Sequence, residues 1–190
     1  MNEKPILFNS EMVNAILSGR KTMTRRIISE KTLHLFGVAA SAGECHPIEL
    51  CDQRSQSYYL DFCPLGKPGD QLWVREAFAA GLCTESTLAY RATHKTEDLE
   101  EGWGETIKWT PSIHMPRWAS RINLLITSVR VERLQDISDA DASAEGCKIS
   151  SMQSGECLSD MFARLWKSIY GDESWQANPW VWVITFRRVA

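Results

Sequence analysis

Two long apolar strands in the second half of the chain constrain its fold more than any other feature. The segment Pro179–Phe186, which reads Pro-Trp-Val-Trp-Val-Ile-Thr-Phe, is rich in the aromatic and β-branched residues that favour extended backbone. A second strand is predicted over 121–134, because its apolar residues alternate with polar ones. The alternation changes register near Ser128, which predicts a β-bulge. The fold must therefore contain a sheet with at least two long strands.

Shorter elements surround these two strands. Alternating or apolar runs predict further strands over 5–8, 71–76 and 88–91. Residues 29–63 show no clear period and are interpreted as a long loop or insertion with at most short strands, and 93–108 as a polar loop. The predicted helices are one capped by Asn9 or Ser10 and ended at Gly19, a short one begun by a Ser138–Asp141 capping box and ended at Gly146, and an amphipathic one over about 157–170 closed by Gly171.

The order of these elements decides the fold class. Strands and helices do not alternate regularly, which argues against a parallel βαβ layout. An α+β fold is expected, namely a small, mostly antiparallel β-barrel with peripheral helices. The 190 residues fit a single domain over 1–190.

Composition limits the kinds of partner. The net charge of −3 means that binding to nucleic acid would require a local basic patch. No signal peptide and no run of about 18 apolar residues is found, so a cytoplasmic protein without membrane contact is expected. The six cysteines are then expected to be reduced.

The segment Gly19–Arg26 contains the strongest candidate site residues. Four of its eight residues are cationic, and two more carry hydroxyls. Arginine matches phosphate geometry, and a buried lysine can lose its proton. The alternative is a solvated charge run that favours a helix C-terminus. The candidate residues of the segment are Arg20, Lys21, Thr24, Arg25 and Arg26.

Three other features are candidates for a site. Glu145 ends a predicted helix, where the helix dipole disfavours an acid and a partner cation would compensate. Between 109 and 121, aromatic and basic residues interleave, as in surfaces that stack bases and bind phosphate, although each tryptophan there can also be a core residue. Cys45, His46, Cys51 and Cys63 could make a zinc site, but they lack a Cys-x-x-Cys pair, so neither a metal nor a cofactor is expected.

The pattern Gly19-x-Lys21-x-x-Thr24-x-Arg26 resembles the Gly-x-Lys-x-x-Thr-x-Arg signature of the ASCH domain, a branch of the PUA-like β-barrel superfamily. The Pro-Gly-Asp turn, the Ser-Asp-Ala-Asp-Ala-Ser-Ala-Glu-Gly helix and the closing strand follow in the order that such domains use. The whole chain also resembles the longer ASCH-like proteins of phages and prophages, through its Trp-Val-Arg-Glu stretch and its Pro-Ser-Ile-His-Met-Pro-Arg-Trp-Ala-Ser-Arg stretch.

This resemblance implies a PUA-like barrel with a cleft beside the signature segment. It also implies RNA or nucleotide binding, and for some members hydrolysis of N4-acetylcytidine or of RNA. In the amidohydrolases a lysine, a threonine and a glutamate form the active site. Their counterparts here are Lys21, Thr24 and Glu145. Compared with those small enzymes, this chain is expected to carry insertions at about 29–67 and 79–110.

Three functions remain open from the sequence. In an amidohydrolase, Thr24 would be the nucleophile, Lys21 the base, Glu145 its orienting or proton-shuttling partner, and Arg26 or a backbone amide the oxyanion holder. In a binding module for RNA, a nucleotide or a modified nucleoside, the cations would hold phosphate and aromatic side chains would stack on a base. The third function is a non-catalytic phage accessory or assembly protein that acts through a protein interface. The residues expected to bind the nucleotide or RNA are Arg20, Arg25, Arg26, Arg117, Trp118 and Trp73.

Overall fold

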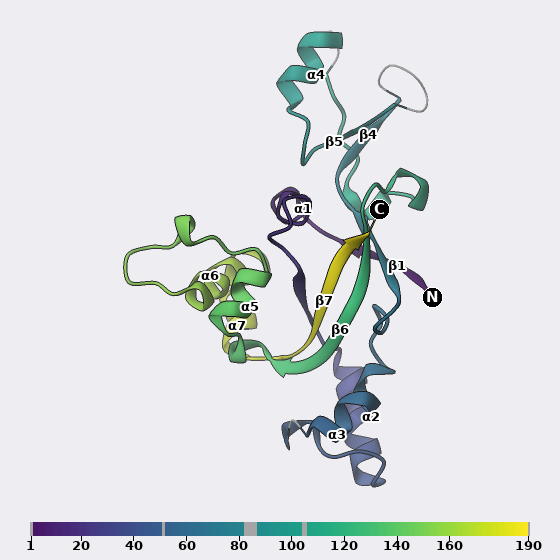
Figure 1. Ribbon diagram of the computed structural model, residues 1–190, viewed down its shortest axis with the longest axis vertical. Helices are drawn as coiled ribbons and strands as arrows, with labels where there is room; N and C mark the ends of the chain where they lie inside the picture. Colours follow the sequence, from purple (N-terminus) through teal and green to yellow (C-terminus); the bar gives the residue numbers. More distant parts are fainter. Residues whose placement is uncertain (1, 51, 82–86, 104–105, 190) are drawn as a thin grey trace.

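A computed structural model describes residues 2–50, 52–81, 87–103 and 106–189. At the centre of this part of the chain lies a five-stranded sheet of order β1-β3-β6-β7-β2 (Figure 1). The pair β1/β3 is parallel and the other pairs are antiparallel. A separate hairpin consists of β4 and β5. The strands are β1 (Glu3–Leu7), β2 (Met23–Ile27), β3 (Gln71–Arg75), β4 (Phe78–Ala80), β5 (Leu88–Tyr90), β6 (Asn123–Arg133) and β7 (Trp180–Val189).

The two long strands predicted from the sequence are confirmed as β6 and β7, which pair along most of their length. The predicted bulge is also present, since the pairing register shifts between Ile126 and Ser128. Residues 180–184 of β7 are all buried. This continuous burial explains why the segment reads as the strongest strand.

The helices surround the sheet. The three predicted ones are confirmed, with Asn9 as the cap of the first and Gly171 as the end of the third. The helices are α1 (Ser10–Leu17), α2 (Glu30–Ser41), α3 (Gln53–Leu60), α4 (Thr96–Trp103), α5 (Asp139–Ala144), α6 (Leu158–Tyr170) and α7 (Asp172–Gln176). Short 3-10 turns cover Ile48–Leu50, Ser112–His114, Arg117–Ala119, Leu134–Asp136 and Ile149–Ser151.

Two loop predictions were wrong. Residues 29–63 contain α2 and α3 rather than a loop with short strands, and 93–108 contains α4. In α2 only Phe36 and Ala39 are buried, so no continuous apolar stripe marks the helix in the sequence. Its cap is Ser29, whose hydroxyl accepts from the backbone N–H of Thr32 at 3.2 Å.

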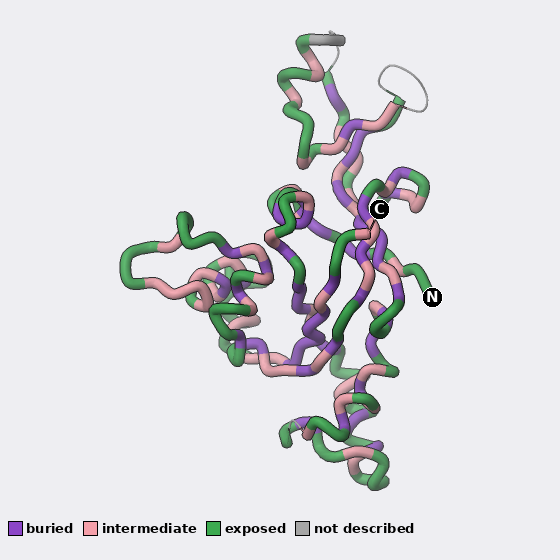
Figure 2. The backbone as a smooth tube through the Cα atoms, in the orientation of Figure 1, coloured by how far each residue is buried: buried purple, intermediate pink, exposed green. Residues whose placement is uncertain are grey.

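Two apolar clusters pack on the two faces of β7. On one face, Trp182 and Ile184 join a cluster that includes α1, α2 and α3, and on the other Val183 joins one that includes α5 and α6. Figure 1 shows α5, α6 and α7 together beside the sheet, α2 and α3 at one end of the molecule, and α4 with the β4/β5 hairpin at the other. Figure 2 shows the buried residues concentrated along the sheet and on the helix faces that cover it.

The α+β class and the mostly antiparallel sheet agree with the sequence prediction. The sheet has β1 and β2 at its edges, and its closure into a barrel stays a prediction. Within the described ranges, every helix is too short or too polar to cross a lipid bilayer.

Candidate functional site

The segment Gly19–Arg26 begins as a turn and ends as a strand. Gly19 adopts a left-handed conformation (φ 75°) after α1, as predicted for a helix end. The backbone N–H of Lys21 then donates to Ala15 O at 2.9 Å, and that of Thr22 donates to Ala144 O at 2.8 Å. These two bonds fix the turn between α1 and the end of α5. From Met23 onward the segment is β2, an edge strand paired only with β7 in the sheet.

Lys21 and Glu145 form a buried ion pair. The Lys21 Nζ lies 2.6 Å from Glu145 Oε2 and 2.9 Å from the Glu145 carbonyl oxygen, and it donates to both. Lys21 is 2% exposed and Glu145 is 7% exposed. The two residues are separated by 124 positions in the sequence. The structure therefore brings together the two residues that the sequence linked only through a resemblance.

The buried environment of Lys21 shifts its pKa. Burial lowers the lysine pKa from its ordinary value, and the charge of Arg26 lowers it further, whereas Glu145 opposes this shift. Neutral Nζ retains two hydrogens, which are sufficient for its two bonds to Glu145. The remaining tetrahedral position then carries a lone pair, and no described residue makes a hydrogen bond there. A neutral Lys21 would thus be oriented as a proton acceptor.

Thr24 lies on β2 and is 1% exposed. Its hydroxyl oxygen accepts from Arg26 Nη1 at 2.9 Å. Because Arg26 only donates, the Thr24 hydroxyl keeps its own proton to give. Arg26 is held by further bonds to the carbonyl oxygens of Arg25 and Leu7, at 3.0 Å each, and its guanidinium lies 5.3 Å from the Phe8 ring centroid.

Arg25 is occupied by carboxylates. Its guanidinium is buried and lies 2.6 Å from Asp141, 3.2 Å from Glu132 and 3.3 Å from Glu145. Arg130 extends this network, since it pairs with both Glu132 and Asp141. The expected role of Arg25 as a phosphate holder therefore has little support in its geometry. The guanidinium instead connects Glu145 to a second layer of acids, which the sequence interpretation had not assigned to the site.

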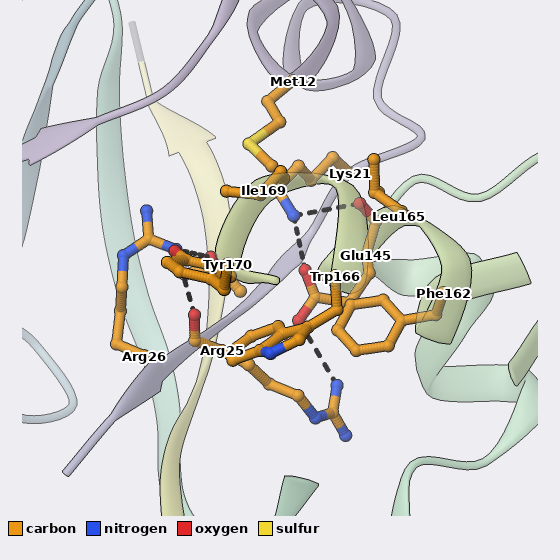
Figure 3. Close-up of a pocket in the computed structure, with 11 residues that line it drawn as sticks. Met12, Lys21, Arg25, Arg26, Glu145, Phe162, Leu165, Trp166, Ile169 and Tyr170 are labelled. Atoms are coloured by element: carbon orange, nitrogen blue, oxygen red, sulfur yellow. Dashed lines mark hydrogen bonds and ion pairs between the residues drawn. The ribbon is translucent and has the colours of Figure 1, made fainter. Parts of the chain in front are cut away.

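A small pocket opens onto these groups (Figure 3). Its volume of ≈ 20 Å³ holds about one water molecule. We call it the inner pocket. Aromatic side chains of α6 form one wall, and the Trp166 and Tyr170 rings lie 4.4 Å apart. The inner pocket is lined by Met12, Lys21, Thr24, Arg25, Arg26, Glu145, Phe162, Leu165, Trp166, Ile169 and Tyr170.

The remaining predicted residues lie elsewhere. Arg20 lines a neighbouring cavity and donates from Nη1 to Gly146 O at 2.8 Å. Trp73 is buried, and the guanidinium of Arg117 lies 5.9 Å from its ring centroid while pairing with Glu3. Trp118 is 67% exposed. None of the last three predicted binding residues lines the inner pocket.

The described cysteines, Cys45, Cys63, Cys147 and Cys157, are free thiols. Cys51, part of the zinc motif considered above, lies outside the described residues. Within the ranges that the structure covers, no three His, Cys, Asp or Glu side chains gather closely enough to hold a metal ion.

No family model and no curated protein matches the sequence. Among solved structures, the hypothetical protein PH0355 is similar over all of both chains (13% identity, TM-score 0.44). An ASCH domain from Lactobacillus crispatus is similar over 98% of this chain and 79% of its own (12%, 0.44). Protein EF3133 from Enterococcus faecalis is similar over 100% and 80% (12%, 0.42). Likenesses this distant assign no activity, and the functional argument rests on the residues of the site.

Proposed function

We propose that this chain is an ASCH-type domain that binds an acylated pyrimidine nucleoside or nucleotide and hydrolyses its exocyclic amide, as in N4-acetylcytidine. The observation that carries the proposal is the buried Lys21–Glu145 pair, which lines one pocket together with Thr24. Burying a lysine is costly, and replacing a buried ion pair by apolar side chains is often neutral or stabilising. A buried Lys21–Glu145 pair that lines a pocket therefore supports a catalytic role more than a stabilising one.

The first half-reaction transfers the acyl group to Thr24. The Thr24 oxygen attacks the amide carbonyl carbon while neutral Lys21 Nζ takes the hydroxyl proton. The carbonyl oxygen becomes an oxyanion, which Arg26 would stabilise, since Arg26 Nη1 donates to the Thr24 oxygen at 2.9 Å. When the oxyanion collapses, the C–N bond breaks and its electron pair goes to the leaving nitrogen. That nitrogen receives the proton from Lys21 and leaves as the free amino group.

The second half-reaction restores the enzyme. A water molecule, which enters where the amine has left, attacks the acyl ester and gives its proton to Lys21. The ester C–O bond breaks, Thr24 recovers a proton from Lys21, and the carboxylic acid leaves. The balance is one amide and one water converted to one acid and one amine. Glu145 keeps the Lys21 nitrogen in place and stabilises its charged form in both half-reactions.

The test is to incubate the protein with N4-acetylcytidine and measure the release of cytidine. Wild type is expected to release cytidine, and both Lys21→Ala and Glu145→Gln are expected to lose about 10²–10⁴-fold in kcat/KM, the range for removal of a proton-transfer group. Lys31→Ala is the matched control, because Lys31 is an exposed lysine of α2. Release by wild type no faster than by Lys21→Ala would overturn the hydrolytic proposal. Binding of N4-acetylcytidine without release of cytidine would then leave a nucleotide-binding module.

A further inference from the structure

A second cavity adjoins the inner pocket. It lies between α1, the turn after α5 and α6, and we call it the outer cavity. It shares Met12, Glu145 and Leu165 with the inner pocket. Its volume is ≈ 350 Å³, which is within the range of small-molecule sites. The inner pocket, at ≈ 20 Å³, has no room for a base and a sugar. Because the inner pocket and the outer cavity share three lining residues, we place the bulk of a nucleoside that reaches Thr24 in the outer cavity.

The charged groups of the outer cavity favour an anion. Arg20 and Lys148 contribute two positive charges. Of the two acids, Glu145 is already paired with Lys21 and Arg25, and Glu11 is an exposed residue in the first turn of α1. Glu11 and Lys148 are both exposed, so solvent screens their charges alike, and the half-buried Arg20 contributes most to the positive charge of the cavity.

One hydrogen bond anchors the Arg20 guanidinium, and its other N–H groups make no hydrogen bond to the described residues. One N–H of Nη1 donates to Gly146 O at 2.8 Å, which anchors the guanidinium at the cavity wall. Arg20 makes no other hydrogen bond to the described residues, and Lys148 makes no ion pair with them. An anchored guanidinium with an unused edge matches the bidentate geometry of phosphate oxygens, and a nearby ammonium adds a second charge.

We propose that Arg20 and Lys148 bind a phosphate group of the substrate in the outer cavity, so that the preferred substrate is an acylated nucleotide rather than the free nucleoside. This inference rests on the proposed function, because it places the base beside Glu145 and the acyl group toward Thr24. Glu145 lines both the inner pocket and the outer cavity, so the bond between the base and the acyl group would lie beside it. Cys147 also lines the outer cavity, but burial raises its thiol pKa to about 11, which disfavours the nucleophilic thiolate form.

The experiment compares N4-acetylcytidine with N4-acetylcytidine 5′-monophosphate as substrates. Wild type is expected to show a kcat/KM at least about tenfold higher for the monophosphate, mainly through KM, since one charge-assisted contact contributes roughly that factor. In Arg20→Ala and Lys148→Ala the ratio of the two kcat/KM values is expected to fall toward one. Arg20→Lys keeps the positive charge but loses the bidentate guanidinium geometry, so an intermediate ratio of the two kcat/KM values is expected. Lys167→Ala, which removes an exposed lysine of α6 that lines neither hollow, should keep the wild-type ratio.

The outcomes separate this inference from the proposed function. Equal kcat/KM for the two substrates in wild type would overturn the phosphate site and leave the hydrolysis intact. If neither substrate is hydrolysed, the proposed function fails, and calorimetric titration with cytidine and cytidine 5′-monophosphate decides the inference. Tighter binding of the monophosphate that is lost in Arg20→Ala would support the phosphate site, and equal affinities would overturn it.

Discussion

Lys21 is a titratable residue in an almost solvent-free position, and its burial contributes to the way the free energy of unfolding depends on pH. Its folded pKa lies below the ordinary lysine value of 10.5 because burial disfavours the ammonium form. Between these two pKa values the unfolded chain binds the proton more tightly than the folded chain. The contribution of Lys21 to stability must therefore rise with pH across this interval and fall as pH is lowered through it.

Lys21→Met is expected to remove this rise. Several other groups act in the opposite direction, since burial raises the pKa of Cys63 and Cys147 and makes the fold less stable as pH rises. The informative quantity is thus the difference in unfolding free energy between wild type and Lys21→Met. Urea unfolding from near neutrality to pH 10.5, the ordinary lysine pKa, should show that difference shifting in favour of wild type. A constant difference would contradict the depressed lysine pKa.

Asp141 acts on the site through Arg25. Its Oδ2 accepts from Arg25 Nη2 at 2.6 Å and from Arg130 Nη2 at 2.7 Å, and Arg25 in turn contacts Glu145. Asp141→Asn is expected to lower kcat about 10- to 100-fold with little change in KM, because Glu145 loses its fixed orientation. It should also cost about 2 kcal/mol of stability through the lost charge-assisted bonds.

Steady-state kinetics with Asp139→Asn as the control tests this positioning role. Asp139 lies in the first turn of the same helix but is exposed and bonds to Ser159 rather than to the arginines. Asp141→Glu should recover part of kcat. If Asp141→Asn unfolds more easily but keeps the wild-type kcat, the residue is merely structural.

At the scale of elements, the turn after α5 determines how closely the helix end approaches Lys21. Gly146 has φ of 99°, and a Cβ there would lie 3.2 Å from Ala15 Cβ and 3.4 Å from Lys21 Cβ. Gly146→Ala should cost about 1–3 kcal/mol for the backbone and a similar amount for the crowding, and it should lower activity by displacing Lys21. Gly69→Ala provides the comparison, because Gly69 has φ of 95° with no atom within 4 Å of an added Cβ. Equal stability losses and full activity in both variants, measured by chemical denaturation and by turnover, would refute the crowding.

Elements with a strong local signal could be predicted from the sequence. The helix α6 buries Phe162 and Trp166 on one face, and β6 and β7 alternate or run continuously apolar, so spacing alone indicates them. The helices α2 and α4 could not be predicted in this way. The first buries only two residues, and the second is a polar segment with acids in its first turn. Their helical state depends on caps and packing that a periodicity argument does not detect.

The candidate site also has parts that the sequence predicts and parts that it does not. Lys21, Thr24 and Glu145 could be proposed from the resemblance, but their convergence depends on contacts across more than a hundred residues. The pairing of Arg25 with Glu132 and Asp141 could not be predicted, since nothing local distinguishes these acids from solvated ones. The one available signal was Asp141 in the Ser138–Asp141 capping box, where the serine hydroxyl accepts from the Asp141 N–H at 3.1 Å. The capping box fixes the backbone at Asp141 but does not predict the partners of the Asp141 carboxylate.

At the scale of the whole molecule, β7 joins the two cores and supports the site strand. Ile184 is fully buried and lies opposite Thr24 on β2 and Val129 on β6. Ile184→Ala is expected to cost about 2–5 kcal/mol, as a cavity in the larger core. Ile27→Ala, at a 45% exposed position on the neighbouring strand, should cost less than about 1 kcal/mol. Similar unfolding midpoints and slopes for the two variants would contradict the assignment of β7 as the centre of the core.

The measurement that tests the central claim most directly is kcat/KM for the hydrolysis of N4-acetylcytidine 5′-monophosphate by wild type, Thr24→Val and Thr127→Val. The two valine variants make the same change, but Thr24 is buried in the inner pocket and Thr127 is an exposed residue of β6. If Thr24 is the nucleophile, Thr24→Val should lose at least about 10³-fold while Thr127→Val keeps the wild-type value. Hydrolysis that survives undiminished in Thr24→Val, or that is absent from wild type, would contradict the account.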